Sequence, residues 1–479
     1  MKSNKEIEPE IKQIFDENEL FHEKNKLDRL RKVIGKFISQ CKSPAGLNSI
    51  LSRLQRIINI HPNTNKKYEN LKKGGFKLLQ LGIPYSINSG VVTVMRNITK
   101  AFQQSGANVA IINHWWHHYH YYDKKLDRNV RVKISPYCLL TGAGEFVALK
   151  WAFKHILKDL RDKGIYFPQI CHVHTHTFYQ DHAIQIFHSF FPKVPIVFTL
   201  HAFIPYLRMS QDQKLKLLAD EMSKEEIQVL RKKGYHYREK SQEKMIMLAD
   251  RVIAISQVHK DAFDRFYPEF SDKCVCIPNG TDFELYTKLE EVIEKERYIR
   301  SMIAPSGERI VIYVGRIEEQ KGAKRLAEGF NLIADKYNDV KLILVGANKS
   351  SENVLTSMGL KSKFLSRVHY AGWINDRATL AAYYRLADVM VQPVFSENLY
   401  SMVALEAMMM KLPVISCPGE LTIGHCKTPH DILKAVDKVF SDKRSVKRHL
   451  DNVKEHVIKN YSLSAVYRRH YKLYRSLLK

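Results

Sequence analysis

The sequence predicts an α/β fold in which two Rossmann-like, doubly wound parallel-sheet domains face a cleft, behind an N-terminal helical extension. Short apolar runs alternate with helical segments from residue 76 onward, and a second set of the same kind begins at residue 309. This alternation is typical of buried parallel strands that are joined by helices. The 479 residues are enough for roughly two to four domains, each with its own core.

Residues 1–72 are predicted to form a basic helical extension. Leu30, Ile34 and Ile38 recur at helical spacing, and Pro62 interrupts the segment. A packing or oligomerisation role is favoured over a nucleic-acid arm, because the segment has few aromatic side chains that could stack on bases.

Residues 73–285 are predicted to form the first Rossmann-like domain. A β-loop-α-β unit opens it, with its strand, loop, helix and strand at residues 76–82, 83–90, 91–104 and 108–113. The unit lacks the G-x-G-x-x-G fingerprint of dinucleotide-binding oxidoreductases, which argues against that class. Gly82 and Gly90 still let a ligand approach the backbone closely.

Histidines and aromatic side chains gather in three places of this domain. Residues 114–123 are interpreted as an aromatic loop at a domain face rather than a metal site, because no recognised ligand spacing occurs there. His172, His174 and His176 would share one face of a strand at residues 170–176, where a polar strand end is favoured over zinc. His201 ends the next strand, and ligands of open α/β sheets bind beyond such strand ends.

Composition and charge divide the rest of the chain. Residues 211–248 are interpreted as a charged, largely helical insertion or interdomain surface, and residues 286–306 as a charged linker between the domains. Residues 307–455 are predicted to form the second Rossmann-like domain. Its strands are expected at residues 309–315, 340–346, 368–372, 389–392 and 412–416. Residues 456–479 end the chain as a basic, aromatic helical segment.

Two cations of the second domain stand beside a predicted helix start. Arg316 follows Gly315 at the end of a strand, and Lys321 lies just before a helix. Fixed cations beside a helix N-terminus form a clamp for a diphosphate, because the first amides of a helix lack internal partners. Surface cations at a turn are the simpler interpretation of such a pair when it is taken alone. Gly372 ends another strand and would let a planar base approach the backbone.

Carboxylates follow the strand at residues 389–392. Glu397 and Asn398 lie in the loop after that strand, and Glu406 lies about a turn inside a helix that opens near Ser401. Taken alone, this stretch fits a strand, a loop and an amphipathic helix with solvated glutamates equally well. Carboxylates also accept hydrogen bonds from sugar and ribose hydroxyls. Cations and carboxylates together therefore fit a nucleoside-diphosphate sugar better than a nucleic-acid backbone.

The overall charge is strongly basic. A formal net charge of +26 and a pI near 9.6 favour anionic partners, whether nucleic acid, an anionic membrane or acidic substrates. Seven cysteines without a C-x-x-C pair indicate free thiols in a reducing compartment. The sequence has no apolar secretory signal at its N-terminus and no run near the ~20 apolar residues of a membrane span. We therefore expect a cytoplasmic protein that can touch a membrane surface.

An ordered set of motifs runs through both halves of the chain. In the second half the motifs are residues 313–322, 344–346, 369–373, 384–389 and 397–408. In the first half they are residues 89–90, 171–174, 198–201, 249–256 and 277–280. In this order they resemble the retaining GT-B glycosyltransferases of family 4 (glycosyl transferases group 1), over about residues 76–475.

The resemblance implies a role for each matching residue. Arg316 and Lys321 would hold the diphosphate and stabilise the departing nucleotide charge without a metal. His201 would lie near the sugar, and these three are the implied catalytic residues. Glu406 would hold the ribose and Glu397 the donor sugar. The implied donor-binding set is Gly90, Gly315, Arg316, Lys321, Gly372, Glu397, Asn398, Tyr400, Ser401 and Glu406.

The resemblance also places the acceptor on the first domain, and makes the C-terminal helix cross back onto that domain. The candidate acceptor residues are His114, Trp115 and His174. One departure from the family pattern affects the sugar site. The paired glutamates of the family stand eight positions apart, whereas Glu406 lies nine positions after Glu397, so Asn398 occupies the expected place. Either the loop has one extra residue or Asn398 replaces the glutamate.

The expected function is that of a metal-independent, retaining glycosyltransferase, a hexosyltransferase, in the cytoplasm. It would use a UDP- or GDP-linked donor and a glycan, lipid-linked or peptide acceptor, without a cofactor or a nucleic-acid partner. Peripheral contact with the anionic inner face of the membrane, and a role in bacterial cell-surface glycan synthesis, are part of the same expectation. Two alternatives remain open. The shifted glutamate and the long helical extension suggest a catalytically weak GT-B-like partner or scaffold, and charge alone suggests a nucleic-acid-binding protein.

Overall fold

The computed structural model describes residues 76–478 except for several gaps. The gaps are residues 83–89, 114–117, 124–127, 134–156, 158–167, 175–179, 204, 206–208, 211–212, 214–215, 218–220, 234–236, 287–288, 348, 396–400, 418 and 420. The predicted extension of residues 1–72 therefore lies outside the described residues. Among the described helices, none is long and apolar enough to cross a bilayer.

The first domain is built on an eight-stranded sheet with the order β4-β3-β2-β1-β5-β6-β7-β8. The strands are β1 (Lys77–Gly82), β2 (Asn108–Asn113), β3 (His118–Asp123), β4 (Arg128–Lys133), β5 (Ile170–His174), β6 (Ile196–Leu200), β7 (Arg251–Ala254) and β8 (Cys274–Cys276). From β2 across to β8 all neighbours run parallel, which confirms the predicted parallel arrangement.

The other edge of this sheet corrects one prediction. The sequence predicts an aromatic loop at residues 114–123, but His118–Asp123 form β3, which pairs antiparallel with β2 and with β4. Tyrosines favour strands, and an antiparallel hairpin can extend a parallel sheet at its edge. The preceding residues 114–117, with His114 and Trp115, lie outside the described residues.

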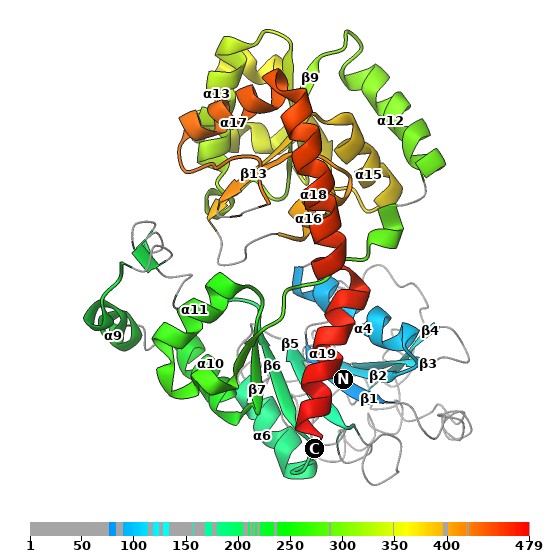
Figure 1. The fold of residues 1–479 in the computed structure, drawn as a ribbon, viewed down its shortest axis with the longest axis vertical. Coiled ribbons are helices and arrows are strands. Elements are labelled where there is room, and N and C mark those ends of the chain that lie inside the picture. Colours follow the sequence, from blue (N-terminus) through cyan, green and yellow to red (C-terminus); the bar gives the residue numbers. More distant parts are fainter. Residues whose placement is uncertain are drawn as a thin grey trace, which may run out of the picture.

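Helices cover both faces of the first sheet (Figure 1). They are α4 (Gly90–Gln104), α6 (Gln180–Phe190), α9 (Lys224–Lys233), α10 (Tyr237–Leu248) and α11 (Gln257–Phe266), with the 3-10 helix η3 (Pro268–Lys273) before β8. The predicted helix at residues 91–104 is α4, which buries Val91, Met95, Ile98 and Phe102 at helical spacing. These side chains form one core, while α6 and α10 contribute to the core on the opposite face.

The segment between the two sheets differs from a plain linker. After the 3-10 helix η4 (Phe283–Tyr286), most of residues 286–306 form α12 (Leu289–Ile303). Val292 and Ile303 of α12 are buried in the core of the second domain. The segment is therefore an amphipathic helix of the second domain. The many charged residues on the other side of α12 are the reason that the sequence suggested a linker.

The second domain has a five-stranded, fully parallel sheet with the order β11-β10-β9-β12-β13. Its strands are β9 (Arg309–Val314), β10 (Val340–Val345), β11 (Val368–Gly372), β12 (Val389–Phe395) and β13 (Val414–Cys417). Its helices are η5 (Glu319–Lys321), α13 (Ala323–Lys336), η6 (Lys349–Ser351), α14 (Glu352–Ser357), η7 (Ser362–Arg367), α15 (Arg377–Leu386), α16 (Met402–Met409) and α17 (Pro429–Ser441). The two faces of this sheet carry separate cores. The predicted doubly wound α/β fold is confirmed.

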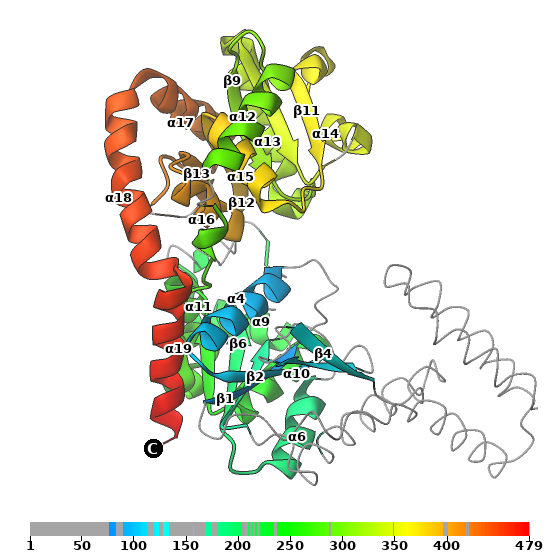
Figure 2. The same cartoon turned by 90° about the vertical axis from the view of Figure 1, so that its right-hand side faces the viewer.

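Two consecutive helices at the end of the chain join the domains. α18 (Lys443–Tyr461) packs on the second domain, and α19 (Leu463–Leu477) returns to the first domain, where it lies beside α4 (Figures 1 and 2). The break between them is at Ser462, whose hydroxyl accepts from the amide of Ala465 and caps α19. Ser462 also forms a β-bridge with Thr281, so both crossings of the chain between the domains meet at one point.

Candidate active site

Glycines shape the carboxyl edge of the second sheet. Gly315, Gly346 and Gly372 follow or end the neighbouring strands β9, β10 and β11. The amide of Gly315 donates to the carbonyl of Val345, and the amide of Gly346 donates to that of Gly372 at 2.7 Å. Hydrogen bonds therefore connect the ends of the three strands. The glycines are half-buried and carry no side chain, at the edge where ligands of such sheets bind.

The start of α13 is held against the end of β12. Gly322, at φ +81°, caps α13, and a Cβ there would lie 1.9 Å from the carbonyl oxygen of Pro393. Arg325 donates from Nε to the same oxygen at 3.1 Å. This close approach requires glycine, and it fixes the N-terminus of α13 beside the exit of β12.

Arg316 and Lys321, the two predicted cations, lie between β9 and α13. Arg316 has a side chain that is 66% exposed, and its Nη1 forms an ion pair with Glu318 at 2.8 Å. Its carbonyl accepts from the hydroxyl of Tyr313 at 2.7 Å. Burial raises the pKa of Tyr313, so this hydroxyl remains a donor. Lys321 is exposed and ends η5. The backbone beneath the cations is thus fixed while their charged ends face solvent.

Glu406 is 3% exposed on α16, and its carboxylate already has two partners. Arg377 donates to Oε1 at 3.1 Å and Tyr384 donates to Oε2 at 3.0 Å. The sequence predicts that this carboxylate binds ribose hydroxyls, and the structure adds two side chains from α15 to its surroundings. Tyr384 belongs to a motif that was noticed in the sequence, whereas nothing in the sequence signalled that Arg377 would reach Glu406.

The loop before α16 is only partly described. Ser401 caps α16 by accepting from the amide of Ala404 at 3.3 Å, as a helix start there requires. Glu397, Asn398 and Tyr400 lie outside the described residues. The choice between Glu397 and Asn398 as the sugar-binding side chain therefore stays a prediction.

His201 follows β6 at the carboxyl edge of the first sheet and is 7% exposed. Its amide donates to the carbonyl of Thr199, and its Nε2 lies 3.0 Å from Nδ1 of His174. His174 is fully buried. Its ring contacts His201, and its place among the acceptor-binding residues stays a prediction.

A second layer of polar side chains lies deeper in this domain. His172 on β5 lies 2.6 Å from the hydroxyl of Thr199 and is also hydrogen-bonded to Tyr474 of α19. Burial, with His470 and His201 nearby, holds the pKa of His172 well below its usual range, and burial lowers the pKa of His470 to about 4. Both rings are therefore neutral near pH 7. In the described part of the chain no group of histidines, cysteines and carboxylates could hold a metal ion.

Gly90 is the first residue of α4 and is exposed, with open space where a Cβ would stand. The helix has no acidic residue in its first turn, so its positive end is not neutralised by its own side chains. This helix start follows the loop after β1, at the same edge of the sheet as His201.

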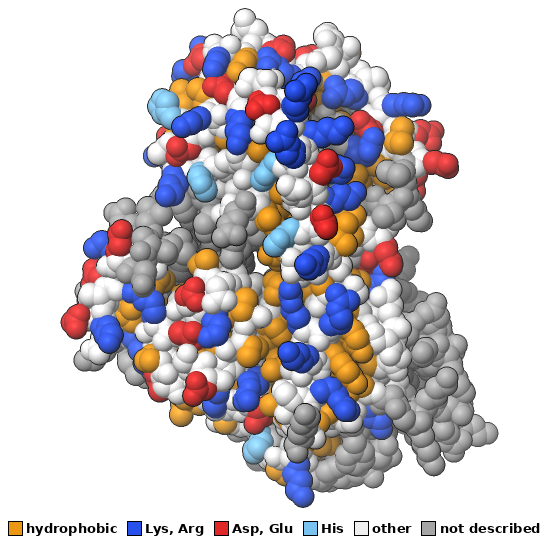
Figure 3. Space-filling view, viewed as in Figure 1, with side chains coloured by type: hydrophobic (Ala, Val, Ile, Leu, Met, Phe, Trp, Pro, Cys, Tyr) orange, Lys and Arg blue, Asp and Glu red, His pale blue; other side chains and the backbone are white. Residues whose placement is uncertain are grey.

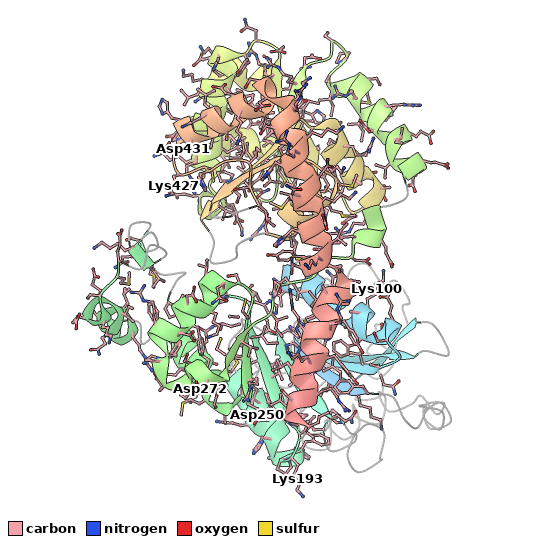
Figure 4. All side chains as sticks on the ribbon, in the orientation of Figure 1. Lys100, Lys193, Asp250, Asp272, Lys427 and Asp431 are labelled. Carbon is pink, nitrogen blue, oxygen red and sulfur yellow. The ribbon has the colours of Figure 1, made fainter. Side chains whose placement is uncertain are left out.

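The two carboxyl edges approach each other at the junction of the domains. Met402, at the start of α16, packs against the core formed by α4 and α19, and its sulfur accepts from the hydroxyl of Thr281 at 3.7 Å. Lys100 of α4 pairs with Asp282 at the same junction, where Figure 4 shows it. The space-filling view is indented between the two domains (Figure 3). The start of α16 and the segment at Thr281 and Asp282 therefore meet α4 at the junction of the domains.

Sequence comparisons match both halves of the chain to glycosyltransferase families. Residues 88–285 match Glycosyltransferase Family 4, and residues 308–431 match Glycosyl transferases group 1. An uncharacterized glycosyltransferase of Methanocaldococcus jannaschii is 29% identical over 44% of this chain and 56% of its own length. A D-inositol 3-phosphate glycosyltransferase of Paenarthrobacter aurescens is 24% identical over 43% of this chain and 52% of its own. The chain spans about half the length of these relatives.

Structural comparison gives the same fold over more of the chain. Anabaena HepE, solved in complex with UDP and glucose, has a TM-score of 0.55 at 15% identity and covers 84% of this chain and 100% of its own. At this identity the likeness concerns the fold alone. It confirms the predicted arrangement of two Rossmann-like domains.

Proposed function

The chain belongs to the GT-B glycosyltransferases of group 1, and we propose that it moves a hexose from a UDP- or GDP-linked donor to an acceptor with retention of anomeric configuration. The observation that carries this proposal is the pair of exposed cations, Arg316 and Lys321, beside the fixed N-terminus of α13. A diphosphate placed there meets two positive side chains and the amides of a helix start. HepE, which shares the fold, was solved with UDP and glucose.

In this proposal the second domain binds the donor. Arg316 and Lys321 neutralise the charge that develops on the departing nucleoside diphosphate, which is the role that a divalent cation has in other transferases. Gly315, Gly372 and Ser401 line the edge where base and phosphates approach backbone, and Glu406 bonds the ribose. Glu397 or Asn398 and Tyr400 complete the donor set around the sugar.

The first domain presents the reacting face of the sugar to the acceptor. His201 is held by His174 and by the backbone of Thr199, so its imidazole has a fixed direction at the strand edge. We place His201 at the reaction centre, Gly90 beside the donor and the segment with His114 and Trp115 near the acceptor. Glycans, lipid-linked sugars and peptides are the acceptor classes. Because the P. aurescens relative is named a D-inositol 3-phosphate glycosyltransferase, inositol phosphate is a further acceptor to test.

Turnover of a donor panel tests the proposal. Purified protein is incubated with UDP- and GDP-linked hexoses and the acceptor classes, and products are read by mass spectrometry, with NMR of the new anomeric centre to show retention or inversion. Arg316→Ala and Lys321→Ala should each lower kcat/KM about 100-fold, since each removes a charge from the departing diphosphate. Lys336→Ala is the matched control, because Lys336 lies at the far end of α13 and pairs with Asp437.

Two outcomes would contradict the proposal. Equal turnover in Arg316→Ala, Lys321→Ala and Lys336→Ala would show that Arg316 and Lys321 do not bind the diphosphate. Tight binding of UDP or GDP by calorimetry, with no transfer to any acceptor and no donor hydrolysis, would favour the alternative of a binding partner or scaffold.

We also propose that the protein works in the cytoplasm at an anionic membrane surface, in the assembly of cell-surface glycans. Lys and Arg side chains gather along α18 and α19 (Figure 3). On α19 Arg468, Lys472 and Arg475 are exposed at helical spacing, and the helix has no acidic residue. Each basic residue near an anionic surface contributes about 1 kcal/mol. Equal flotation with neutral and with anionic liposomes would contradict this location.

A further inference from the structure

The last helix of the chain reaches the interior of the first sheet through Tyr474. Its ring is fully buried, with centroids 5.9 Å from Phe76 and 5.4 Å from Phe102. These ring contacts alone would dock α19. The hydroxyl adds a hydrogen bond to Nδ1 of His172, 302 positions away in the chain. Because a buried hydroxyl is costly unless it is bonded, this bond is a specific part of the docking.

The sheet face beneath α19 changes from apolar to polar along the strands. Leu78 pairs in register with Ile170, and two residues further Gln80 pairs with His172, so all four point to the same face. All four are fully buried. The amide of Gln80 makes no hydrogen bond with any described residue. A core that served packing alone would stay apolar, and this one becomes polar toward the edge where His201 lies.

His172 lies between two hydroxyls. Nδ1 bonds to Tyr474, and Nε2 is 2.6 Å from Oγ1 of Thr199. Burial and the neighbouring His470 and His201 keep its pKa low, so the ring is neutral and has one donating and one accepting nitrogen. The tautomer and the orientation of His172 therefore depend on both hydroxyls together.

Two contacts lead from this ring to His201. The backbone carbonyl of Thr199 accepts a hydrogen bond from the amide of His201 at 3.1 Å. Thr199 therefore contacts both His172, through its hydroxyl, and the backbone of His201. The ring of His174 lies with its centroid 3.8 Å from that of His172, and its Nδ1 is 3.0 Å from Nε2 of His201. A change in the orientation of His172 thus reaches His201 through both contacts.

We propose that Tyr474 is a positioning residue for His201, acting through His172, Thr199 and His174, so that sugar transfer depends on the seating of α19 against the first domain. This inference rests on the proposed function, in which His201 lies at the reaction centre. Since α19 continues from the helix that packs on the second domain, the same bond would make catalysis sensitive to the relative position of the two domains.

Tyr474→Phe tests the inference, because it removes the hydroxyl and keeps the ring. We expect kcat to fall about 10- to 100-fold, as for a misplaced reacting group, with donor KM and UDP affinity within about twofold of wild type. Tyr471→Phe is the matched control: Tyr471 also packs on Phe76, and its hydroxyl makes no hydrogen bond with described residues. Thr199→Val removes the hydroxyl on the other side of His172 and should repeat the loss if Tyr474→Phe folds poorly.

The histidine tautomers give a readout that needs no substrate. Long-range nitrogen–proton NMR of ¹⁵N-histidine-labelled full chain should show changed signals for both His172 and His201 in Tyr474→Phe, and unchanged signals in Tyr471→Phe. A change confined to His172, a kcat equal to that of Tyr471→Phe, or a loss that lies in KM or UDP affinity would each overturn the inference. If wild type turns over no donor, the proposed function fails, while the NMR result still decides whether Tyr474 orients His201.

Discussion

At the carboxyl edge of the first sheet, His201 is nearly buried and contacts the ring of His174 and the backbone carbonyl of Thr199, whereas at the edge of the second sheet Arg316 is two-thirds exposed and pairs with Glu318. The first edge gains its order from buried hydrogen bonds that reach back to α19. The second edge is ordered by backbone contacts, above all at Gly322, and the charged ends of Arg316 and Lys321 are exposed. A sugar-transfer site with these halves would hold a group near the sugar in place and let cations close on the diphosphate.

The largest expected effect comes from disrupting the backbone contact between Gly322 and Pro393 at the edge of the second sheet. Gly322→Ala places a Cβ against the carbonyl of Pro393 at a positive φ, so we expect the free energy of unfolding to fall by at least about 3 kcal/mol, measured by urea denaturation. Gly307→Ala is the control, because Gly307 has φ +80° but open space around it. Its loss should be about 1 kcal/mol. Equal losses would mean that backbone strain, and not the contact with Pro393, sets the requirement for glycine.

A smaller effect concerns the buried histidines behind the first edge. The pKa of His470 in the folded protein is about 4, below the ordinary value of about 6.5. Below pH 6.5 the unfolded chain therefore binds more protons than the folded protein, and stability falls as the pH drops from about 6.5 toward 4. We expect His470 to account for a loss of about 2 kcal/mol between pH 7 and pH 5.

Urea denaturation at the two pH values measures this loss as a difference between variants. His470→Gln should reduce the pH dependence by that amount, while His456→Gln, at an exposed position of α18, should leave it as in wild type. If His470→Gln keeps the full pH dependence, the neutral buried ring is not its source.

The smallest expected effect on stability comes from removing the exposed ion pair between Arg316 and Glu318 at the edge of the second sheet. Glu318→Gln removes the anionic partner of Arg316, and because exposed ion pairs contribute little, the free energy of unfolding should change by less than about 0.5 kcal/mol. UDP should bind about two- to threefold more tightly by calorimetry, since the diphosphate no longer competes with a carboxylate. Glu328→Gln, whose partner is Lys324, should leave UDP affinity unchanged. An unchanged affinity in Glu318→Gln would mean that Arg316 does not face the diphosphate.

Local patterns were enough to predict the alternating strands and helices, the parallel sheets and the glycines at strand ends. Each of these depends on periodicity or backbone freedom within a few residues. Ser401 was recognisable as a helix start for the same reason. The hairpin of β3 and β4 and the amphipathic helix α12 were missed, since aromatic and charged residues masked their periodicity.

Contacts between distant residues could not be predicted from the sequence. The bonds of Glu406 to Arg377 and Tyr384 join two helices, and the bond of Tyr474 to His172 joins the last helix to the middle of the first sheet. No pattern along the chain records such pairs, because they exist only once both elements are packed.

The crossing of the chain at Ser462 has a consequence for dividing this protein into pieces. The polypeptide that forms the first sheet ends long before α19, so a fragment cut between the sheets would leave the groove over Phe76 and Phe102 without its cover. The other fragment would carry Tyr467, Tyr471 and Tyr474 on an unsupported helix. We therefore expect a first-half fragment to need an added peptide with the sequence of α19 to complete its fold.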